Sequence, residues 1–193
     1  NVHVPEFMAE IVATLSHLAR SSPHINQRSG VSVRLSIANY ETLTANAARR
    51  ALRLGEKDAV PRVSDLEALV SSTSGKVEIE SIDEGRDDQV VERLLKAAVL
   101  TVFKERCPMD QLRDAITAFN ESTIVHAGDD LSSADYVKVL DSLPALRPSV
   151  NALAGSESPG AVASAVEFVL EGLHLSKRLN KEAAGTRATY RGR

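Results

Sequence analysis

Apolar residues that recur at the spacing of a helix constrain this chain more than any other feature. The clearest case is the segment 87–106, in which Val91, Leu95, Ala98 and Val102 line one face. Aromatic residues make up 4% of the chain, and Trp is absent. A core with so few rings is built mainly from Ala, Val and Leu, which favours helices packed on helices. The sequence therefore predicts a mainly α fold.

Periodicity and capping residues predict further helices at about residues 5–20, 32–54, 64–71, 109–121, 132–143 and 158–179. A capping box at Ser64 and Glu67 opens one of them, and Ser158 before Pro159 opens the last. The segment 144–153 is also helical in composition, although Pro148 interrupts it.

The start of the second helix can be read in two ways. Residues 31–37 alternate apolar and polar side chains as a strand does, but Ala-rich sequence follows and Gly55 is a typical helix end. We therefore expect one long helix, with Ser29 or Ser32 as its cap. Its apolar ladder at helical spacing consists of Ile37, Tyr40, Thr44, Ala47, Ala51 and Leu54.

Strand signals are few. Lys76 to Glu80 alternate as a strand does, residues 83–86 follow as a turn, and the other strand-like stretch is 123–126. We expect at most a small β element near residues 76–82. The Ser- and Gly-rich stretch 71–75 separates a lid-like helical domain, 1–75, from a C-terminal helical accessory module, 76–193. From Lys177 onward the chain is basic, and we expect a solvated, partly disordered tail.

Charge and cysteine content exclude some classes of partner and favour one compartment. The formal net charge is −3, so nucleic acid is an unlikely partner. Cys107 is the only cysteine, which fits a reducing cytosol. The longest apolar run, residues 97–103, is far shorter than the ~20 residues that span a bilayer. The first residues read like the middle of a protein, so we expect a missing partner region.

Most catalytic and metal-binding signatures are absent from the sequence. Gly75 and Lys76 do not form a phosphate-binding loop, because Val70 and Val77 stand where Gly and Ser or Thr belong. The histidines and Cys107 have no metal-ligand spacing. The carboxylate pairs Asp129–Asp130 and Glu78–Glu80 fit a turn and a solvated face.

Arg34 is the remaining candidate, because it falls in the first turn of the long helix. Helix N-termini favour anions, and a guanidinium there can hold a phosphate with two hydrogen bonds. On the residues alone, Arg34 is either such a phosphate contact or a surface arginine whose stem packs on a neighbouring helix.

The stretch ARSSPHINQRSGVSVRLSIANYETLTANAARRAL, residues 19–52, resembles the helical lid of AAA+ ATPases of the group that contains the magnesium chelatase ATPase subunit and the MoxR-type ATPases. In that group small residues precede the sensor 2 arginine and an Ala-rich helix follows it. Here Ser29, Gly30, Ser32 and Arg34 stand in that order. The neighbouring segments VPEFMAEIVATLSHLARSS and VSDLEALVSS match the other lid helices in kind, so the resemblance covers roughly residues 1–75.

The resemblance implies that Arg34 senses the γ-phosphate of ATP and couples hydrolysis to lid movement, with Arg28 as the alternative. ATP and Mg²⁺ would be bound by an N-terminal ATPase domain, in a ring of identical copies that remodels a partner protein or assists metal insertion. Whether the arginine acts on its own subunit or on a neighbour is open. Walker A, Walker B and arginine-finger motifs have no counterpart here, so we expect this chain alone neither to bind ATP tightly nor to hydrolyse it. The alternative is a non-enzymatic helical interaction or regulatory module.

Overall fold

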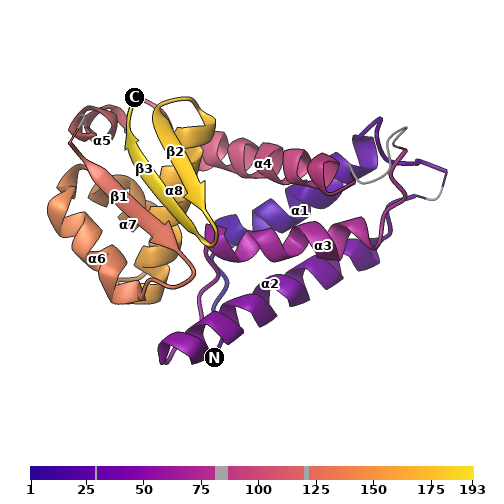
Figure 1. Ribbon diagram of the computed structural model, residues 1–193, viewed down its shortest axis with the longest axis horizontal. Coiled ribbons are helices and arrows are strands. Elements are labelled where there is room, and N and C mark those ends of the chain that lie inside the picture. The colour runs from indigo at the N-terminus through magenta and orange to yellow at the C-terminus, as the bar shows by residue number, and fades with distance from the viewer. Residues whose placement is uncertain (29, 81–86, 120–121) are drawn as a thin grey trace.

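A computed structural model describes residues 1–28, 30–80, 87–119 and 122–193. It shows a mainly helical fold with a small antiparallel sheet (Figure 1). The helices are α1 (Glu6–Ser21), α2 (Val33–Leu54), α3 (Ala68–Ser74), α4 (Asp87–Arg106), α5 (Arg113–Ala118), α6 (Ser133–Ser142), α7 (Arg147–Ala154) and α8 (Pro159–Leu175), with 3-10 turns η1 (Val63–Glu67) and η2 (Pro144–Leu146). The strands are β1 (Ile124–Gly128), β2 (Leu179–Ala184) and β3 (Arg187–Gly192).

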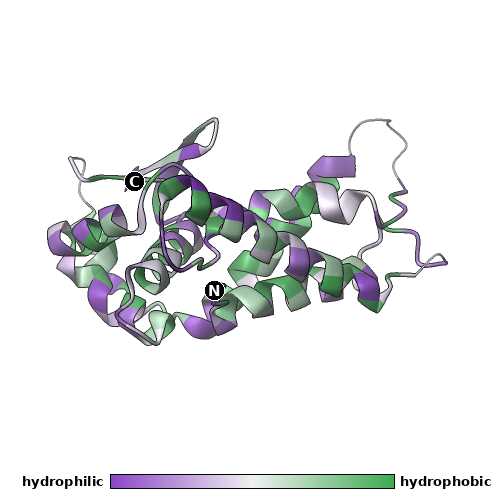
Figure 2. Ribbon diagram, turned by 90° about the horizontal axis from the view of Figure 1, so that it is seen from below, coloured by the Kyte–Doolittle hydropathy of each residue, from purple (hydrophilic) through white to green (hydrophobic). Residues whose placement is uncertain are grey.

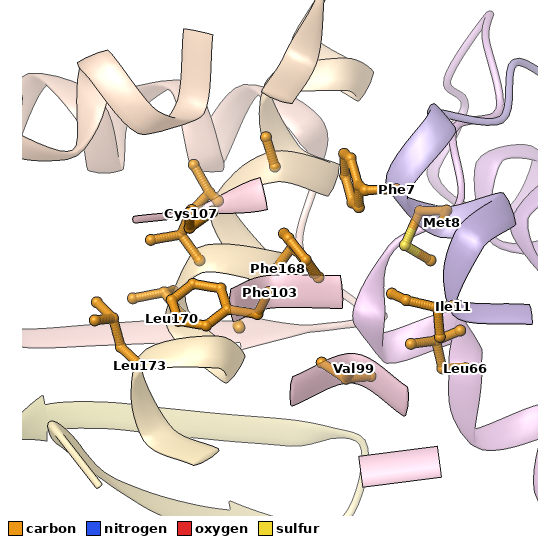
Figure 3. Packing of buried hydrophobic residues seen from close by; sticks show 14 of the residues in the cluster. Phe7, Met8, Ile11, Leu66, Val99, Phe103, Cys107, Phe168, Leu170 and Leu173 are labelled. Atoms are coloured by element: carbon orange, nitrogen blue, oxygen red, sulfur yellow. The ribbon is translucent and has the colours of Figure 1, made fainter. Parts of the chain in front are cut away.

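Helix α8 lies at the centre of the core. Every residue from Ala161 to Leu173 is buried, so this helix is covered on all sides. The ring of Phe168 stacks on Phe7 of α1 at 4.5 Å between centroids and meets Phe103 of α4 edge-on at 5.9 Å (Figure 3). One core cluster therefore contains residues from before and after position 75. The division into units 1–75 and 76–193 stays a prediction.

The long helix α2 has the predicted bounds. The backbone N–H of Arg34 donates to Oγ of Ser32 at 3.2 Å, and Gly55 ends the helix with a φ of 69° in the left-handed region. Ser29, the other predicted cap, lies outside the described residues. Residues 31 and 32 are not in a strand, so the strand interpretation of this stretch is wrong.

The buried face of α2 is not the predicted ladder. Ala47 and Ala51 are buried, but Ile37 and Tyr40 are 55% and 42% exposed. The helix instead packs through a second set with the same periodicity, which consists of Leu35, Asn39, Leu43, Ala47 and Arg50. This set includes polar residues whose partners are distant in sequence. The Nδ2 of Asn39, for example, donates to Oγ1 of Thr73 in α3 at 2.9 Å.

The C-terminal residues form a β-hairpin, not a disordered tail. Strand β3 pairs antiparallel with β2 on one side and β1 on the other, so the strand order is β1-β3-β2. The last helix ends at Leu175, earlier than predicted, and Lys177 then adopts a left-handed φ of 60° that turns the chain into β2. The hairpin buries Leu179 and Tyr190.

The other strand predictions had mixed outcomes. Strand β1 confirms the stretch near 123–126. Within described residues 76–80, the predicted element is only an isolated bridge between Ile79 and Ile25, and residues 81 and 82 lie outside the described residues. The turn at 83–86 also lies outside them. The helix predicted at 109–121 is shorter, and α5 covers Arg113–Ala118.

Gly172 of α8 lies directly against the ring of Phe103 in α4. A Cβ placed on Gly172 would lie 2.0 Å from Cδ2 of Phe103, deep in the core. We therefore expect Gly172→Ala to lower the free energy of unfolding by about 1–3 kcal/mol, because the Phe103 ring must leave its packed position. Urea titration of the two proteins measures the difference. Gly75→Ala is the control, since its nearest new contact is an ordinary 3.6 Å. Equal losses for both variants would contradict this account of the packing.

Candidate functional site

Arg34 lies in the first turn of α2, with its side chain exposed. Its backbone N–H is bound to the Ser32 cap, but its guanidinium makes no hydrogen bond or ion pair within the part of the chain that the structure describes. Gly30, which precedes it, has a φ of 67° and so turns the chain in a conformation that favours glycine. The arginine is therefore free to meet a ligand.

Arg28 lies in the loop before α2 and is also exposed. Its backbone N–H donates to Oδ1 of Asn26 at 2.9 Å, and its guanidinium has no hydrogen-bond or ion-pair partner among the described residues. This loop and the start of α2 lie at the end of the molecule remote from the sheet (Figure 1). The two predicted arginines thus share one end of the fold, and the structure records no contact between them.

The structure also contains a cleft that the sequence did not predict. It has a volume of about 670 Å³ and lies between the sheet and the helices α2, α3, α4 and α8. The three strands contribute only methyl groups where Ala127 and Ala183 flank Ala188 in the sheet. The opposite wall is formed by larger apolar residues, Leu66, Val70, Leu95 and Val99. Its volume and partly apolar lining fit the usual range for a ligand site.

Glu171 of α8 lines this cleft and is only 5% exposed. Its Oε2 accepts hydrogen bonds from Nζ of Lys181 at 2.7 Å and from the hydroxyl of Tyr190 at 2.5 Å. Its Oε1 makes no hydrogen bond to any described residue. Burial, and then the nearby Glu171 charge, raise the pKa of the Tyr190 hydroxyl, so this phenol stays a donor. Glu171 thus has one carboxylate oxygen that no described residue uses.

Glu167 lies one turn earlier on α8 and is 2% exposed. Its Oε2 accepts the backbone N–H of Ser64 at 2.7 Å, and its Oε1 accepts the Ser64 hydroxyl at 3.3 Å and the hydroxyl of Tyr136. Desolvation by burial raises the pKa of this carboxyl, although Arg62 and these donors oppose that effect. Glu167 therefore binds a proton more readily than an exposed glutamate.

A network of buried ion pairs lies beside Glu167. Arg50 donates to Asp65 at 2.9 Å and to Glu56 at 3.3 Å, and Arg62 donates to Glu56 at 3.1 Å. Asp65 Oδ2 also accepts the backbone N–H of Arg62 at 2.8 Å. Asp65, and not the predicted pair Ser64 and Glu67, is therefore the residue that caps this segment. The remaining donors of Arg62 reach Leu131 O at 2.8 Å and Oγ of Ser133 at 2.6 Å, while its buried Nε makes no hydrogen bond to a described residue. The network therefore holds the loop after α2 against η1 and the start of α6.

The sequence reasoning missed Glu167 and Glu171 because it followed only the apolar residues of the last helix. The available signal was a pair of acidic residues four apart inside an otherwise apolar run, which places both on one buried face. Among the described residues no group of three or more His, Cys, Asp or Glu is arranged to hold a metal ion. No helix in that part of the chain has the length and apolarity needed to cross a membrane.

The comparisons with known proteins returned nothing. No family model, no curated protein and no solved structure matches this chain.

The raised pKa of Glu167 predicts how stability depends on pH. Between its ordinary value of 4.5 and the raised native value, the folded state holds more protons than the unfolded state, so stability falls as pH rises through that window. A tenfold difference in proton affinity between the two states corresponds to about 1.4 kcal/mol. We expect the wild type to lose stability relative to Glu167→Gln as the pH rises above the ordinary pKa of 4.5, as measured by urea titration at several pH values. A difference between the two proteins that does not change with pH would refute this.

Proposed function

We propose that this chain is the lid and accessory part of an AAA+ ATPase similar to the magnesium chelatase ATPase subunit and the MoxR-type group, with Arg34 as its nucleotide sensor. The observation that carries the proposal is the free, exposed guanidinium of Arg34 in the first turn of the 22-residue helix α2. The order of α1, the loop with Gly30 and Ser32, α2 and α3 supports it, because the resemblance implies those elements in that order.

The chemistry of this helix start suits a phosphate. The N-terminal end of a helix carries a partial positive charge, and the arginine adds a permanent charge with a planar fork of donors. In phosphoryl transfer a positioned arginine stabilises charge on the transferred group. Arg34 would contact the γ-phosphate of ATP held with Mg²⁺ by an ATPase domain elsewhere in the parent protein, and Arg28 is the alternative contact. The parent would be a cytoplasmic ring of identical copies that acts on a protein substrate.

The test is ATP hydrolysis by the full-length parent. We expect Arg34→Ala to lower turnover by a factor on the order of 100 or more, because the developing charge loses its partner. Arg34→Lys keeps the charge but loses the fork, so it should recover only part of the rate. Turnover of the Arg28→Ala variant tests the alternative contact: a loss of turnover there, with unchanged turnover in Arg34→Ala, would assign the sensor role to Arg28. Circular dichroism and sedimentation establish that each variant is folded and assembled. Unchanged turnover in Arg34→Ala would exclude the sensor role.

A second candidate function, the non-enzymatic interaction module, is supported by the cleft. Its lining is partly apolar and includes the buried carboxylate of Glu171, one oxygen of which makes no hydrogen bond to a described residue. A lysine or arginine side chain has the matching chemistry, since its apolar stem can lie along the walls while its head donates to Glu171. The cleft would then receive a basic segment of a partner protein.

Substitutions at neighbouring positions of β2 test the cleft. Ala183 lines it, whereas Ala184 does not, because successive side chains of a strand point to opposite faces. Both are exposed, so either can be enlarged without opening the core. We expect a fluorescent octalysine peptide to bind with weak affinity, Ala183→Phe to weaken it about tenfold, or by about 1.4 kcal/mol, and Ala184→Phe to leave it unchanged. Equal effects of the two variants in fluorescence anisotropy would count against the cleft.

A further inference from the structure

The hydroxyl of Tyr136 has two acceptors within reach but only one proton. Tyr136 lies in α6 and is fully buried. Its hydroxyl oxygen accepts the backbone N–H of Gly128 at 2.9 Å, so that contact does not use the proton. The carbonyl oxygen of Gly128, at 3.2 Å, and Oε1 of Glu167 both lie where they can accept it. Because a phenol carries a single proton, the hydroxyl must choose between these two oxygens.

The protonation state of Glu167 decides which oxygen receives the proton of Tyr136. An ionised Glu167 has no proton to donate, and its charge makes it the stronger of the two acceptors. A protonated Glu167 can donate to the hydroxyl oxygen of Tyr136, and the hydroxyl then donates to the carbonyl of Gly128. The other hydrogen bond of that carbonyl, from the backbone N–H of Leu131 at 3.4 Å, is present in both arrangements. The carbonyl of Gly128 therefore gains or loses one donor.

The charges around Glu167 act in both directions. Burial raises the pKa of its carboxyl and Asp65 adds to that effect, whereas Arg62 lowers it. The other titratable or charged groups near it are Arg50 of α2, Tyr136 of α6, Glu171 of α8 and Tyr190 of β3. Lys181 of β2 and Glu92 and Lys96 of α4 line the same cleft, and Arg147 of α7 is exposed and paired with Asp141.

Tyr136 keeps its proton while Glu167 titrates. Burial, and then the charge of Glu167, raise the pKa of the Tyr136 hydroxyl. The phenol is thus a donor in both arrangements, and only the acceptor changes.

The chain turns away from the sheet after Gly128, at a place where several elements meet. We call residues 128–131 the β1 turn. A Cβ on Gly128 would lie 2.8 Å from the carbonyl oxygen of Thr186, so the turn lies against the tip of the hairpin. Asp129 pairs with Arg53 of α2 at 2.9 Å and lines the cleft together with Gly128. The sheet and α6 lie at the same end of the molecule in both views (Figure 1 and Figure 2). The β1 turn therefore joins the sheet, α2 and one end of the cleft.

We propose that Tyr136 is a proton-dependent hydrogen-bond switch, which donates to the carbonyl of Gly128 when Glu167 is protonated and to Glu167 when that residue is ionised. Protonation of Glu167 then holds the β1 turn with one more hydrogen bond, and a rise in pH removes that bond. The inference goes beyond the proposed function and does not rest on it, because it needs neither a nucleotide nor a partner protein.

NMR spectroscopy of the isotope-labelled 193-residue chain tests the proposal, in a pH series that begins below the ordinary carboxyl pKa of 4.5. The side-chain carboxyl ¹³C signal of Glu167 reports its protonation. The backbone carbonyl ¹³C signal of Gly128 reports the hydrogen bonds that this oxygen accepts. We expect both signals to titrate with one midpoint, which lies above 4.5.

Two variants separate the switch from a direct effect of charge. In Glu167→Gln the side-chain oxygen must still accept the backbone N–H of Ser64, which lies at 2.7 Å in the wild type, so the amide N–H faces Tyr136 as the protonated acid does. We expect its Gly128 carbonyl signal to stay at the low-pH position of the wild type at every pH. In Tyr136→Phe, Glu167 should still titrate while the Gly128 carbonyl signal no longer follows it.

Glu171→Gln is the matched control, because Glu171 lies one turn further along α8 and is hydrogen-bonded to a different tyrosine. It should leave the titration of the Gly128 carbonyl as in the wild type. A Glu167 that stays ionised down to acid unfolding overturns the proposal, as does a Gly128 signal that does not follow Glu167. A Gly128 titration that persists in Tyr136→Phe does so too, since charge alone would then cause it. If Tyr136→Phe does not fold, a Glu167→Gln signal away from the low-pH position is sufficient to overturn it.

Discussion

Burial of α8 on all sides is the constraint on which the rest of the structure depends. An apolar helix in this position can be covered by other apolar surfaces, but α8 also carries Glu167 and Glu171 into the interior. Buried carboxyl groups must be hydrogen-bonded. The donors come from three separate places: Ser64 in η1, Tyr136 in α6, and Lys181 with Tyr190 in the hairpin. The polar requirements of one helix therefore fix where three other elements lie around it.

The same requirement explains why the cleft is where it is. Lys181 and Tyr190 hold one end of the hairpin close to α8 through Glu171. Farther along the sheet the paired positions that line the cleft are Ala127, Ala188 and Ala183, which offer only methyl groups. Ala127 is buried in the core and Ala188 packs against it, whereas Ala183 is exposed. The short side chains at these positions leave room for the cleft.

Local signals predicted the bounds of elements better than their buried faces. Ser32 and Gly55 predicted α2 because a cap and a left-handed glycine act within one turn. The buried face of α2 could not be chosen in the same way, since two sets of residues share the helical period. The set that packs includes Asn39 and Arg50, whose partners Thr73 and Asp65 are distant in sequence. Contacts with partners that are distant in sequence cannot be predicted from the spacing of apolar residues.

The hairpin was missed for a related reason. Its lysines and arginines are typical of a solvated terminus. Strand β3 forms by pairing with β1, which lies far earlier in the chain, so the pairing cannot be predicted from local sequence. Arg34 needed no such partner, so its place in the first turn of α2 could be predicted from sequence. Glu167 and Glu171 were visible only as a charge spacing in an apolar run.

The chain order of these contacts has a consequence for how the protein is made. Helix α8 leaves the ribosome before β2 and β3, so Glu171 has neither Lys181 nor Tyr190 while it emerges. Strand β1 is translated before α8, so a longer interval passes before β3, its strand neighbour in the described sheet, has been made. During synthesis the region around α8 therefore passes through a stage with an unneutralised carboxylate and an unpaired strand edge. The core closes only when the hairpin has been translated.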